Sequence, residues 1–190
     1  MLAASSGNNA IVKALILADA DLDCRTVEDG CTALMLAAAG MHDAAVMLLI
    51  NAGAAVDGRC KLGNTALMYA AISNDIASLR LLLDAGASID ATTHGGQTAL
   101  SLAAHNENSD TVEMLTVRGA ATECRTVSGL TPLMIMAQRG SLAAVLELLA
   151  AGANGNAVAP DGRTALEMTE EAFGEHIKDI VRGANARPDT

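Results

Sequence analysis

The stretch GNTALMYAA, from Gly63 to Ala71, recurs in variant forms along the chain. The other forms are GCTALMLAA from Gly30, GQTALSLAA from Gly96, GLTPLMIMA from Gly129 and GRTALEMTE from Gly162. Each form begins 33 residues after the one before it. A fixed period of this length is the sequence signature of a repeat architecture, so the period decides the fold before any single helix is assigned.

A second motif keeps the same period further along each repeat. It reads LLINAGAAVD, LLLDAGASID, LTVRGAATE and LLAAGANGN, and it ends at Asp57, Asp90, Glu123 and Asn156. Between the two motifs, a third position holds a residue whose side chain can accept from the free N–H groups of a helix start. This position is occupied by Asp75, Asn108 and Ser141. Two linked motifs and a shared capping position indicate one structural unit per 33 residues.

These motifs and the capping position predict two helices and a connecting loop in each unit. A threonine follows each Gly-x pair and can cap a first helix of about two turns, whose small alanines let a neighbouring helix approach closely. These threonines are Thr32, Thr65, Thr98, Thr131 and Thr164. A second helix is expected from Asp75, Asn108 or Ser141 to a glycine that takes the left-handed conformation. These glycines are Gly53, Gly86, Gly119 and Gly152, and the turn-forming residues that follow predict a projecting hairpin or loop.

The two ends of the sequence depart from the repeat. Residues 2–23 fit the pattern from mid-repeat onward, with Asp19 in place of the closing glycine, so the chain is expected to begin inside a helix. The opening motif is missing there, which is consistent with a fragment of a longer array. At the other end, Ile177, Ile180 and Val181 form the apolar stripe of an otherwise polar terminal helix. A polar outer side is expected where stacking stops.

Composition narrows the possible functions. The 190 residues are 51% hydrophobic and 1% aromatic, so alanine and leucine must fill thin helical layers. The net charge of −10 argues against binding to nucleic acid or to an anionic membrane surface. A secretory signal and a membrane-spanning apolar run are both missing from the sequence. Four cysteines without a CxxC pair indicate reduced thiols, and we expect a cytoplasmic or nuclear location.

Catalytic and metal-binding patterns are also missing from the sequence. Ser, Cys and His occur, but no short constellation pairs a nucleophile with a base. The four histidines occupy different phases of the repeat and lack metal-ligand spacing. Neither a Walker motif nor a dinucleotide-binding glycine pattern is found. We therefore expect no catalytic residues, no metal, no cofactor and no enzymatic activity.

The combined pattern of G-x-T-A/P-L-x-x-A-A, a capped second helix and L-L-x-x-G-A resembles the ankyrin repeat. The resemblance implies an all-α ankyrin-repeat solenoid of stacked helix-turn-helix units with projecting β-hairpin loops, in a single array over residues 1–190. Its divisions are a partial repeat 1–26, full repeats 27–59, 60–92, 93–125 and 126–158, and a degenerate capping repeat 159–190. The usual TPLH histidine is replaced by Met35, Met68, Ser101, Met134 and Glu167, which predicts looser hairpins.

The resemblance also implies a non-catalytic protein–protein interaction module, a scaffold or adaptor that binds partner segments on a concave surface of first helices and hairpins. The candidate contacts are Arg25, Arg59, Lys61, Asn64, Ile72, Ser73, His94, Gln97, His105, Asn106, Arg125, Val127, Leu130, Gln138 and Arg139. Among them, Ile72 and Leu130 are expected to be exposed and to suit an apolar anchor of the partner.

Arginine recurs at one hairpin phase, at Arg25, Arg59 and Arg125, with Lys61 close by. Because arginine binds carboxylates in a bidentate manner, we expect a protein or peptide partner with an acidic, extended segment, bound by a monomer. The competing interpretation is that these arginines are only solvated side chains of an exposed loop. The alternative function is a regulatory ankyrin domain excised from a larger enzyme, channel or signalling protein, and an enzyme in its own right is a more distant rival.

Overall fold

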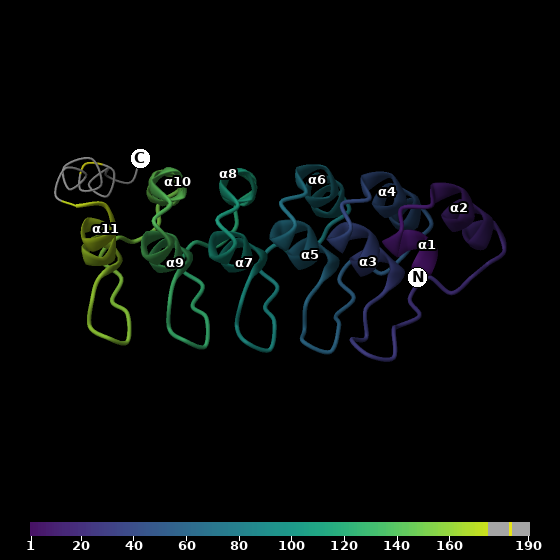
Figure 1. Ribbon diagram of the computed structural model, residues 1–190, viewed down its shortest axis with the longest axis horizontal. Coiled ribbons are helices and arrows are strands. Elements are labelled where there is room, and N and C mark those ends of the chain that lie inside the picture. The colour runs from purple at the N-terminus through teal and green to yellow at the C-terminus, as the bar shows by residue number, and fades with distance from the viewer. Residues whose placement is uncertain (175–182, 184–190) are drawn as a thin grey trace. The chain divides into compact units, whose positions relative to one another are not determined.

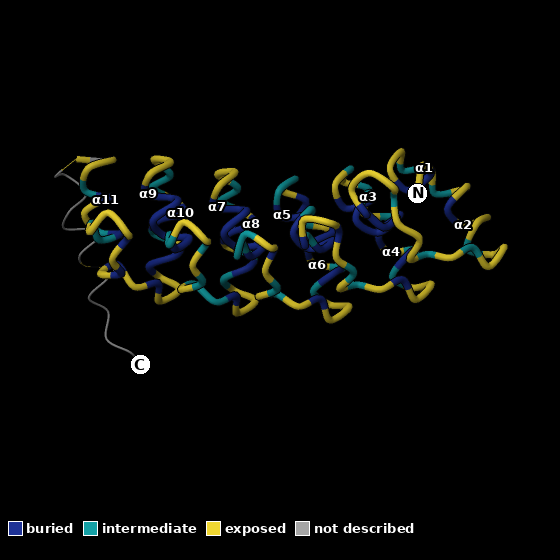
Figure 2. The backbone as a smooth tube through the Cα atoms, turned by 90° about the horizontal axis from the view of Figure 1, so that it is seen from below, coloured by how far each residue is buried: buried dark blue, intermediate teal, exposed yellow. Residues whose placement is uncertain are grey.

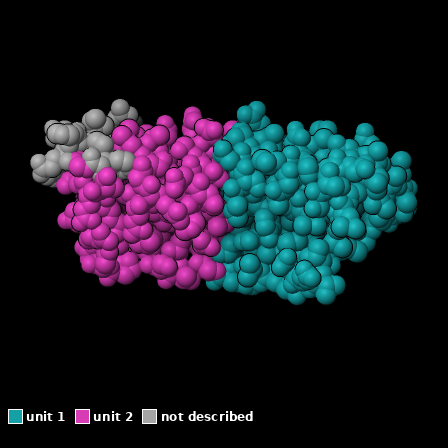
Figure 3. Space-filling view, in the orientation of Figure 1, with its two compact units in different colours: residues 1–94 teal, residues 95–190 magenta. Residues whose placement is uncertain are grey.

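The computed structural model describes residues 1–174 and residue 183. The chain forms two compact units, residues 1–94 and 95–190, which are described separately (Figure 3). Regular secondary structure in the described residues is α-helical, apart from an isolated antiparallel bridge between Val158 and Thr164. The fold is therefore all-α, as the repeat pattern predicts.

The first unit contains two layers of helices (Figure 1). Its helices are α1 (Leu2–Ser5), α2 (Asn9–Leu17), α3 (Ala33–Ala39), α4 (Asp43–Asn51), α5 (Ala66–Ile72) and α6 (Ile76–Asp84). The first helix of each repeat packs on the first helix of the next, so α3 contacts both α1 and α5. The second helices form the other layer, in which α4 contacts both α2 and α6.

The second unit repeats this arrangement. Its helices are α7 (Ala99–His105), α8 (Ser109–Val117), α9 (Pro132–Arg139), α10 (Leu142–Ala150) and α11 (Ala165–Phe173). Helix α9 packs between α7 and α11, and α10 packs on α8. Within each unit, the hairpin loops extend from the first helices on the side away from the second helices (Figure 1). The expected terminal stripe of Ile177, Ile180 and Val181 lies outside the described residues.

Threonine starts every full first helix, as predicted. The side chains of Thr32, Thr65, Thr98, Thr131 and Thr164 each accept a hydrogen bond from the backbone N–H three residues on. Pro132 stands at the start of α9, where its missing N–H costs nothing. The capping bonds satisfy donors that a helix leaves unpaired at its start, and they fix where each helix begins.

Four of the five residues that replace the family histidine contribute to these caps, namely Met35, Ser101, Met134 and Glu167. Ser101 Oγ accepts from the N–H of Thr98 at 2.9 Å, and Glu167 Oε2 accepts from that of Thr164 at 2.7 Å. The sulfurs of Met35 and Met134 accept from their capping threonines at 3.4 Å. The expectation of looser hairpins thus overlooked hydrogen bonds that the replacement residues supply.

The second helices begin at the predicted position, but by different means. Asp75 caps α6 by accepting from the N–H of Ser78 at 3.1 Å. Asn108 and Ser141 are the N-cap residues of α8 and α10, yet their side chains make no capping hydrogen bond, so this part of the prediction was wrong. The second helices end as predicted at glycines with positive φ, and Asp19 takes the same conformation with φ 51°.

Small side chains allow the first helices to pack closely. Ala37, Ala38, Ala70 and Ala71 in the first unit are fully buried, and Ala103 and Ala104 hold the same positions in the second. Figure 2 shows burial concentrated in the helices, with exposed backbone at the hairpin ends and the turns between helices. Since alanine projects little beyond the backbone, the core consists of thin layers lined by leucine and methionine.

Candidate functional site: hairpin tips and first-helix ends

Adjacent hairpins are joined by backbone hydrogen bonds within each unit. In the first unit, the N–H of Lys61 donates to the carbonyl of Asp29 at 2.8 Å, and the N–H of His94 donates to that of Leu62 at 3.1 Å. In the second unit, the N–H of Val127 donates to Gly95 at 3.1 Å. Pro160 holds the next equivalent position and has no N–H to donate, so proline ends this series.

The hairpin arginines also join neighbouring repeats. Arg25 donates through Nη1 to the carbonyl of Arg59, and Arg59 donates in turn to the carbonyl of Thr92 at 2.6 Å. Arg125 donates to the carbonyls of Gly129 and Val158 at 2.7 and 3.0 Å. These side chains are exposed, yet each is held against the hairpin of the next repeat. The shared position of these arginines was predicted from the sequence, but their hydrogen bonds to the next repeat were not.

Acidic residues make a second connection between repeats. Asp23 accepts from the N–H of Ala55 at 3.0 Å, and Asp57 accepts from that of Ser88 at 2.9 Å. Glu123 takes the same role in the second unit, where it accepts from the N–H of Asn154 at 2.9 Å. Each of these three carboxylates therefore pairs with a backbone donor of the following repeat, which gives their recurrence a structural reason.

Aliphatic side chains stand exposed at the ends of the hairpins. Val27 is 90% exposed, Leu62 is 69% exposed and Val127 is 79% exposed. Sequence reasoning included Val127 and missed Val27, although both end the same tetrapeptide, CRTV. Together with Lys61 and His94, these residues are called the tip residues. They present apolar groups beside basic ones, a combination suited to a protein surface.

The C-terminal ends of the first helices carry a varied set of side chains. In the first unit, Ser73 Oγ donates to the carbonyl of Ala39 at 3.0 Å. In the second, Nη2 of Arg139 lies 2.8 Å from Nε2 of His105, and Nη1 lies 3.9 Å from Glu107.

Exposure separates the predicted contacts into two groups. The exposed residues are Arg25, Arg59, Lys61, His94, His105, Asn106, Arg125, Val127, Gln138 and Arg139. The half-buried residues are Asn64, Ile72, Ser73, Gln97 and Leu130. The expectation that Ile72 and Leu130 are exposed anchors was therefore wrong, because neighbouring residues cover part of each side chain.

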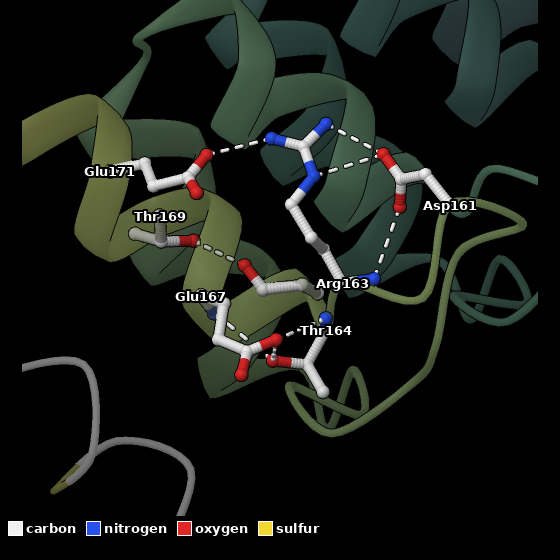
Figure 4. Close-up of polar contacts among 7 residues, drawn as sticks. Asp161, Arg163, Thr164, Glu167, Thr169 and Glu171 are labelled. Atoms are coloured by element: carbon white, nitrogen blue, oxygen red, sulfur yellow. Dashed lines mark hydrogen bonds and ion pairs between the residues drawn. The ribbon is translucent and has the colours of Figure 1, made fainter.

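The last described hairpin carries a charged network that sequence reasoning missed (Figure 4). Arg163 donates to Asp161 at 2.6 Å and to Glu171 at 2.7 Å. The side-chain hydrogen bond from Arg163 lowers the pKa of Asp161. The backbone N–H and the hydroxyl of Thr164 lower the pKa of Glu167, which closes the capping box of α11. An arginine two residues after an aspartate in a turn was the available signal.

The described residues contain no cluster of three or more His, Cys, Asp or Glu side chains that could hold a metal ion. Within the same part of the chain, no helix has the length and apolar character required to cross a bilayer. The hairpin arginines and the carboxylates that follow the second helices make structural hydrogen bonds to backbone atoms of the next repeat.

Comparison with known proteins agrees with this architecture. The family model described as "Ankyrin repeats (3 copies)" matches residues 1–93 and 100–182. Among solved structures, the chain is similar to an ankyrin repeat domain from Acinetobacter baumannii AYE, with 29% sequence identity and a TM-score of 0.88. That similarity covers 98% of this chain and 97% of the other. No curated protein matches the chain.

The family match extends over most of the residues that carry the 33-residue period, and it includes both units. The structural similarity extends over nearly the full length of both chains. Ankyrin repeats in general mediate contacts between proteins. The chain belongs to the ankyrin repeat family.

Proposed function

We propose that the chain is a non-catalytic protein-binding module whose partner contacts the tip residues and the C-terminal ends of the first helices. One observation carries this proposal. The positions that build the fold hold the same residue in repeat after repeat, such as the capping threonine and the leucine two residues later. The tip position instead holds Val27, Lys61, His94 and Val127 in turn. The braced hairpins hold this varied surface in place.

The first-helix ends vary in the same way. One equivalent position holds Ala39, Ile72, His105 and Gln138, and the next holds Gly40, Ser73, Asn106 and Arg139. A position that must pack or cap admits few residues, whereas one that faces a ligand is free to differ between repeats. Asn64, Gln97 and Leu130 are half-buried members of the predicted contacts within their own units.

The tips also favour a specific kind of contact. Val27 and Leu62 offer aliphatic area beside the charge of Lys61 in the first unit, and Val127 does so beside Arg125 in the second. Buried apolar groups supply most of the free energy at protein interfaces. The described part of the proposed surface has little aromatic area of its own, so the partner brings the aromatic anchors.

A finer proposal concerns the charge of the partner segment. A guanidinium has five N–H donors, so one or two bonds to backbone carbonyls leave Arg59 and Arg125 able to bind a carboxylate as well. Lys61 Nζ likewise donates to the carbonyl of Val27 at 2.7 Å and keeps further donors. We propose that an acidic, extended segment of the partner binds along the hairpins within a unit.

Capture of partners from a lysate, followed by quantitative mass spectrometry, tests the module when matched variants are compared. Val127→Asp changes a tip residue that is 79% exposed, and Val117→Asp makes the same change on α8 at a residue that is 78% exposed. The proposal expects Val127→Asp to lose a protein that the parent and Val117→Asp both retain. Loss with Val117→Asp alone would place binding on the second helices and contradict it.

The acidic segment is tested with the purified partner. Substituting Lys61→Ala is expected to weaken binding by about 1 kcal/mol, with the loss shrinking at high salt. An equal loss of binding free energy at low and high salt would contradict the proposal of an acidic segment. It would not contradict the proposal that the chain binds a protein. A catalytic turnover that one side-chain substitution abolishes would contradict the non-catalytic assignment.

A further inference from the structure

Two buried thiols meet where the hairpin of one repeat lies against the next. Cys31 and Cys60 are each 5% exposed. Cys31 Sγ lies 3.3 Å from the phenol oxygen of Tyr69, and that oxygen donates to Cys60 Sγ at 3.6 Å. One oxygen therefore contacts both sulfurs, which places the sulfurs no more than about 7 Å apart.

The backbone brings these two residues together. The N–H of Lys61, next to Cys60, donates to the carbonyl of Asp29, two residues before Cys31. A Cβ added at Gly30 would lie 3.1 Å from the side chain of Lys61, so the two segments are in close contact. Both cysteines thus lie on adjoining stretches of hairpin in the first unit, and hydrogen bonds fix their separation.

The surroundings of the two sulfurs differ in a way that suits thiol chemistry. Burial raises the pKa of Cys31, and the hydrogen bond between Cys31 and Tyr69 offsets only part of this rise. Burial also acts to raise the pKa of Cys60, but hydrogen bonds from Tyr69 and from three backbone groups lower it below its usual value. The backbone groups belong to Leu62, Gly63 and Asn64. Cys60 therefore ionises before Cys31.

Neither sulfur is needed to form a hairpin. Thr26 and Thr126 hold positions equivalent to that of Cys60, and their hydroxyls accept the N–H of Cys31 and Leu130 at 2.9 and 3.4 Å. The position of Cys31 is occupied elsewhere by Asn64, Gln97 and Leu130. A hydroxyl therefore performs the structural task at Thr26 and Thr126, and the paired thiols are particular to this junction.

We propose that Cys31 and Cys60 are a site of reversible oxidation, at which a small hydroperoxide converts the two thiols into a disulfide. The Cys60 thiolate attacks the peroxide, so that an S–O bond forms and the O–O bond breaks. The leaving alkoxide, or hydroxide when the oxidant is hydrogen peroxide, takes a proton from solvent and departs as the alcohol or as water. The Cys31 sulfur then attacks the sulfenic acid, so that the S–S bond forms, and the S–O oxygen leaves as water with the Cys31 proton. Two electrons pass from the thiols to the peroxide.

The bond would join the first two hairpins beside the tip residues Lys61 and Leu62. Tyr69 holds both sulfurs before the reaction and must withdraw its oxygen as they approach. Oxidation would then fix the spacing of two adjacent tips, which the reduced protein maintains through hydrogen bonds. This inference concerns the chain alone and stands whether or not a partner binds the tips.

A variant carrying Cys24→Ser and Cys124→Ser isolates the pair for testing. After treatment with hydrogen peroxide, we expect a mass decrease of about 2 Da. We also expect a cross-linked peptide joining residues 31 and 60, and a higher melting temperature that dithiothreitol reverses. Adding Cys31→Ser should abolish the link and leave a sulfenic acid at Cys60 that dimedone traps.

A further variant, Tyr69→Phe, removes the shared hydroxyl and should slow formation of the link relative to the same background with Tyr69. If both thiols stay reduced at peroxide concentrations that oxidise exposed Cys24 in the parent, the proposal is overturned. Oxidation of Cys60 to the sulfinic acid without any cross-link would also overturn it, because the resolving role of Cys31 would then be absent.

Discussion

The guanidinium of Arg59 donates a hydrogen bond of 2.6 Å from Nη1 to the carbonyl oxygen of Thr92, one repeat further along the chain. Arg25 makes the equivalent bond to Arg59, and Arg125 makes it to Val158. In an acidic chain, arginine recurs at this position because a long cationic side chain can reach a carbonyl of the next hairpin. These bonds brace the hairpins that carry the proposed binding surface.

Replacing this brace should reduce stability. We expect Arg59→Ala to lower the free energy of unfolding by about 1 kcal/mol, since a hydrogen bond to an exposed carbonyl is lost and water replaces it. Urea denaturation of the parent and the variant measures the difference. Arg80→Ala is the matched control, because Arg80 is an exposed arginine on the outer helix α6. Equal losses in both variants would show that the bond to Thr92 contributes nothing.

Met41 lies in an unfavourable backbone conformation. It occupies the turn between α3 and α4 with φ 57°, and its side chain is 60% exposed. Left-handed φ costs a residue with a β-carbon roughly 1 kcal/mol, which glycine avoids. We therefore expect Met41→Gly to raise the free energy of unfolding by up to about 1 kcal/mol, as measured by thermal or urea denaturation.

The reverse substitution provides the control. Gly140 holds the equivalent position in the second unit with φ 74°, and a Cβ there would meet no atom within 4 Å. Gly140→Ala should therefore destabilise the protein by about 1 kcal/mol through backbone strain alone. Stabilisation by Gly140→Ala, or destabilisation by Met41→Gly, would contradict the account of this turn.

Much of the fold could be predicted from the sequence because the same local interactions recur in each repeat. Thr32 and its equivalents cap the first helices, and Gly53 and its equivalents end the second ones, as expected. Both partners of these interactions lie within a few residues of each other, so a single short motif includes them. Repetition at a fixed period then indicates which elements lie side by side, since each unit must pack on its neighbours.

The candidate site was predicted less well because it depends on contacts between repeats. The bond from Arg59 to Thr92 joins residues 33 apart, and no local motif encodes it. The partial burial of Ile72 and Leu130 likewise results from neighbouring segments. Cys31, Cys60 and Tyr69 meet across a hairpin junction, and their spacing resembles no known thiol motif.

Glu167 predicts a dependence of stability on pH. Its pKa is lowered from the usual 4.5 by hydrogen bonds from Thr164. A carboxylate whose pKa is depressed on folding stabilises the fold above its unfolded pKa, and this contribution is lost as the pH falls through the folded pKa. Glu167→Ala should therefore destabilise the protein at pH 7, and the difference from the parent should shrink below about pH 4.5.

Denaturation of both proteins at pH 7 and pH 3.5 measures this effect. Glu113→Ala is the control, because Glu113 is an exposed glutamate on α8 outside any helix cap. The small effect of Glu113→Ala on the free energy of unfolding should not change with pH in the way that the effect of Glu167→Ala does. A gap between the parent and Glu167→Ala that stays constant, or widens, as the pH falls would contradict the capping role of this carboxylate.

Hydrogen exchange with and without the captured partner tests the binding surface most directly. Our account predicts slower amide exchange on complex formation in the hairpins around Lys61 and Val127 and at the C-terminal ends of the first helices. Exchange in the second helices, including α4 and α10, should be unchanged. Protection confined to the second helices, with the hairpins exchanging as in the free protein, would contradict binding of the partner at the tip residues.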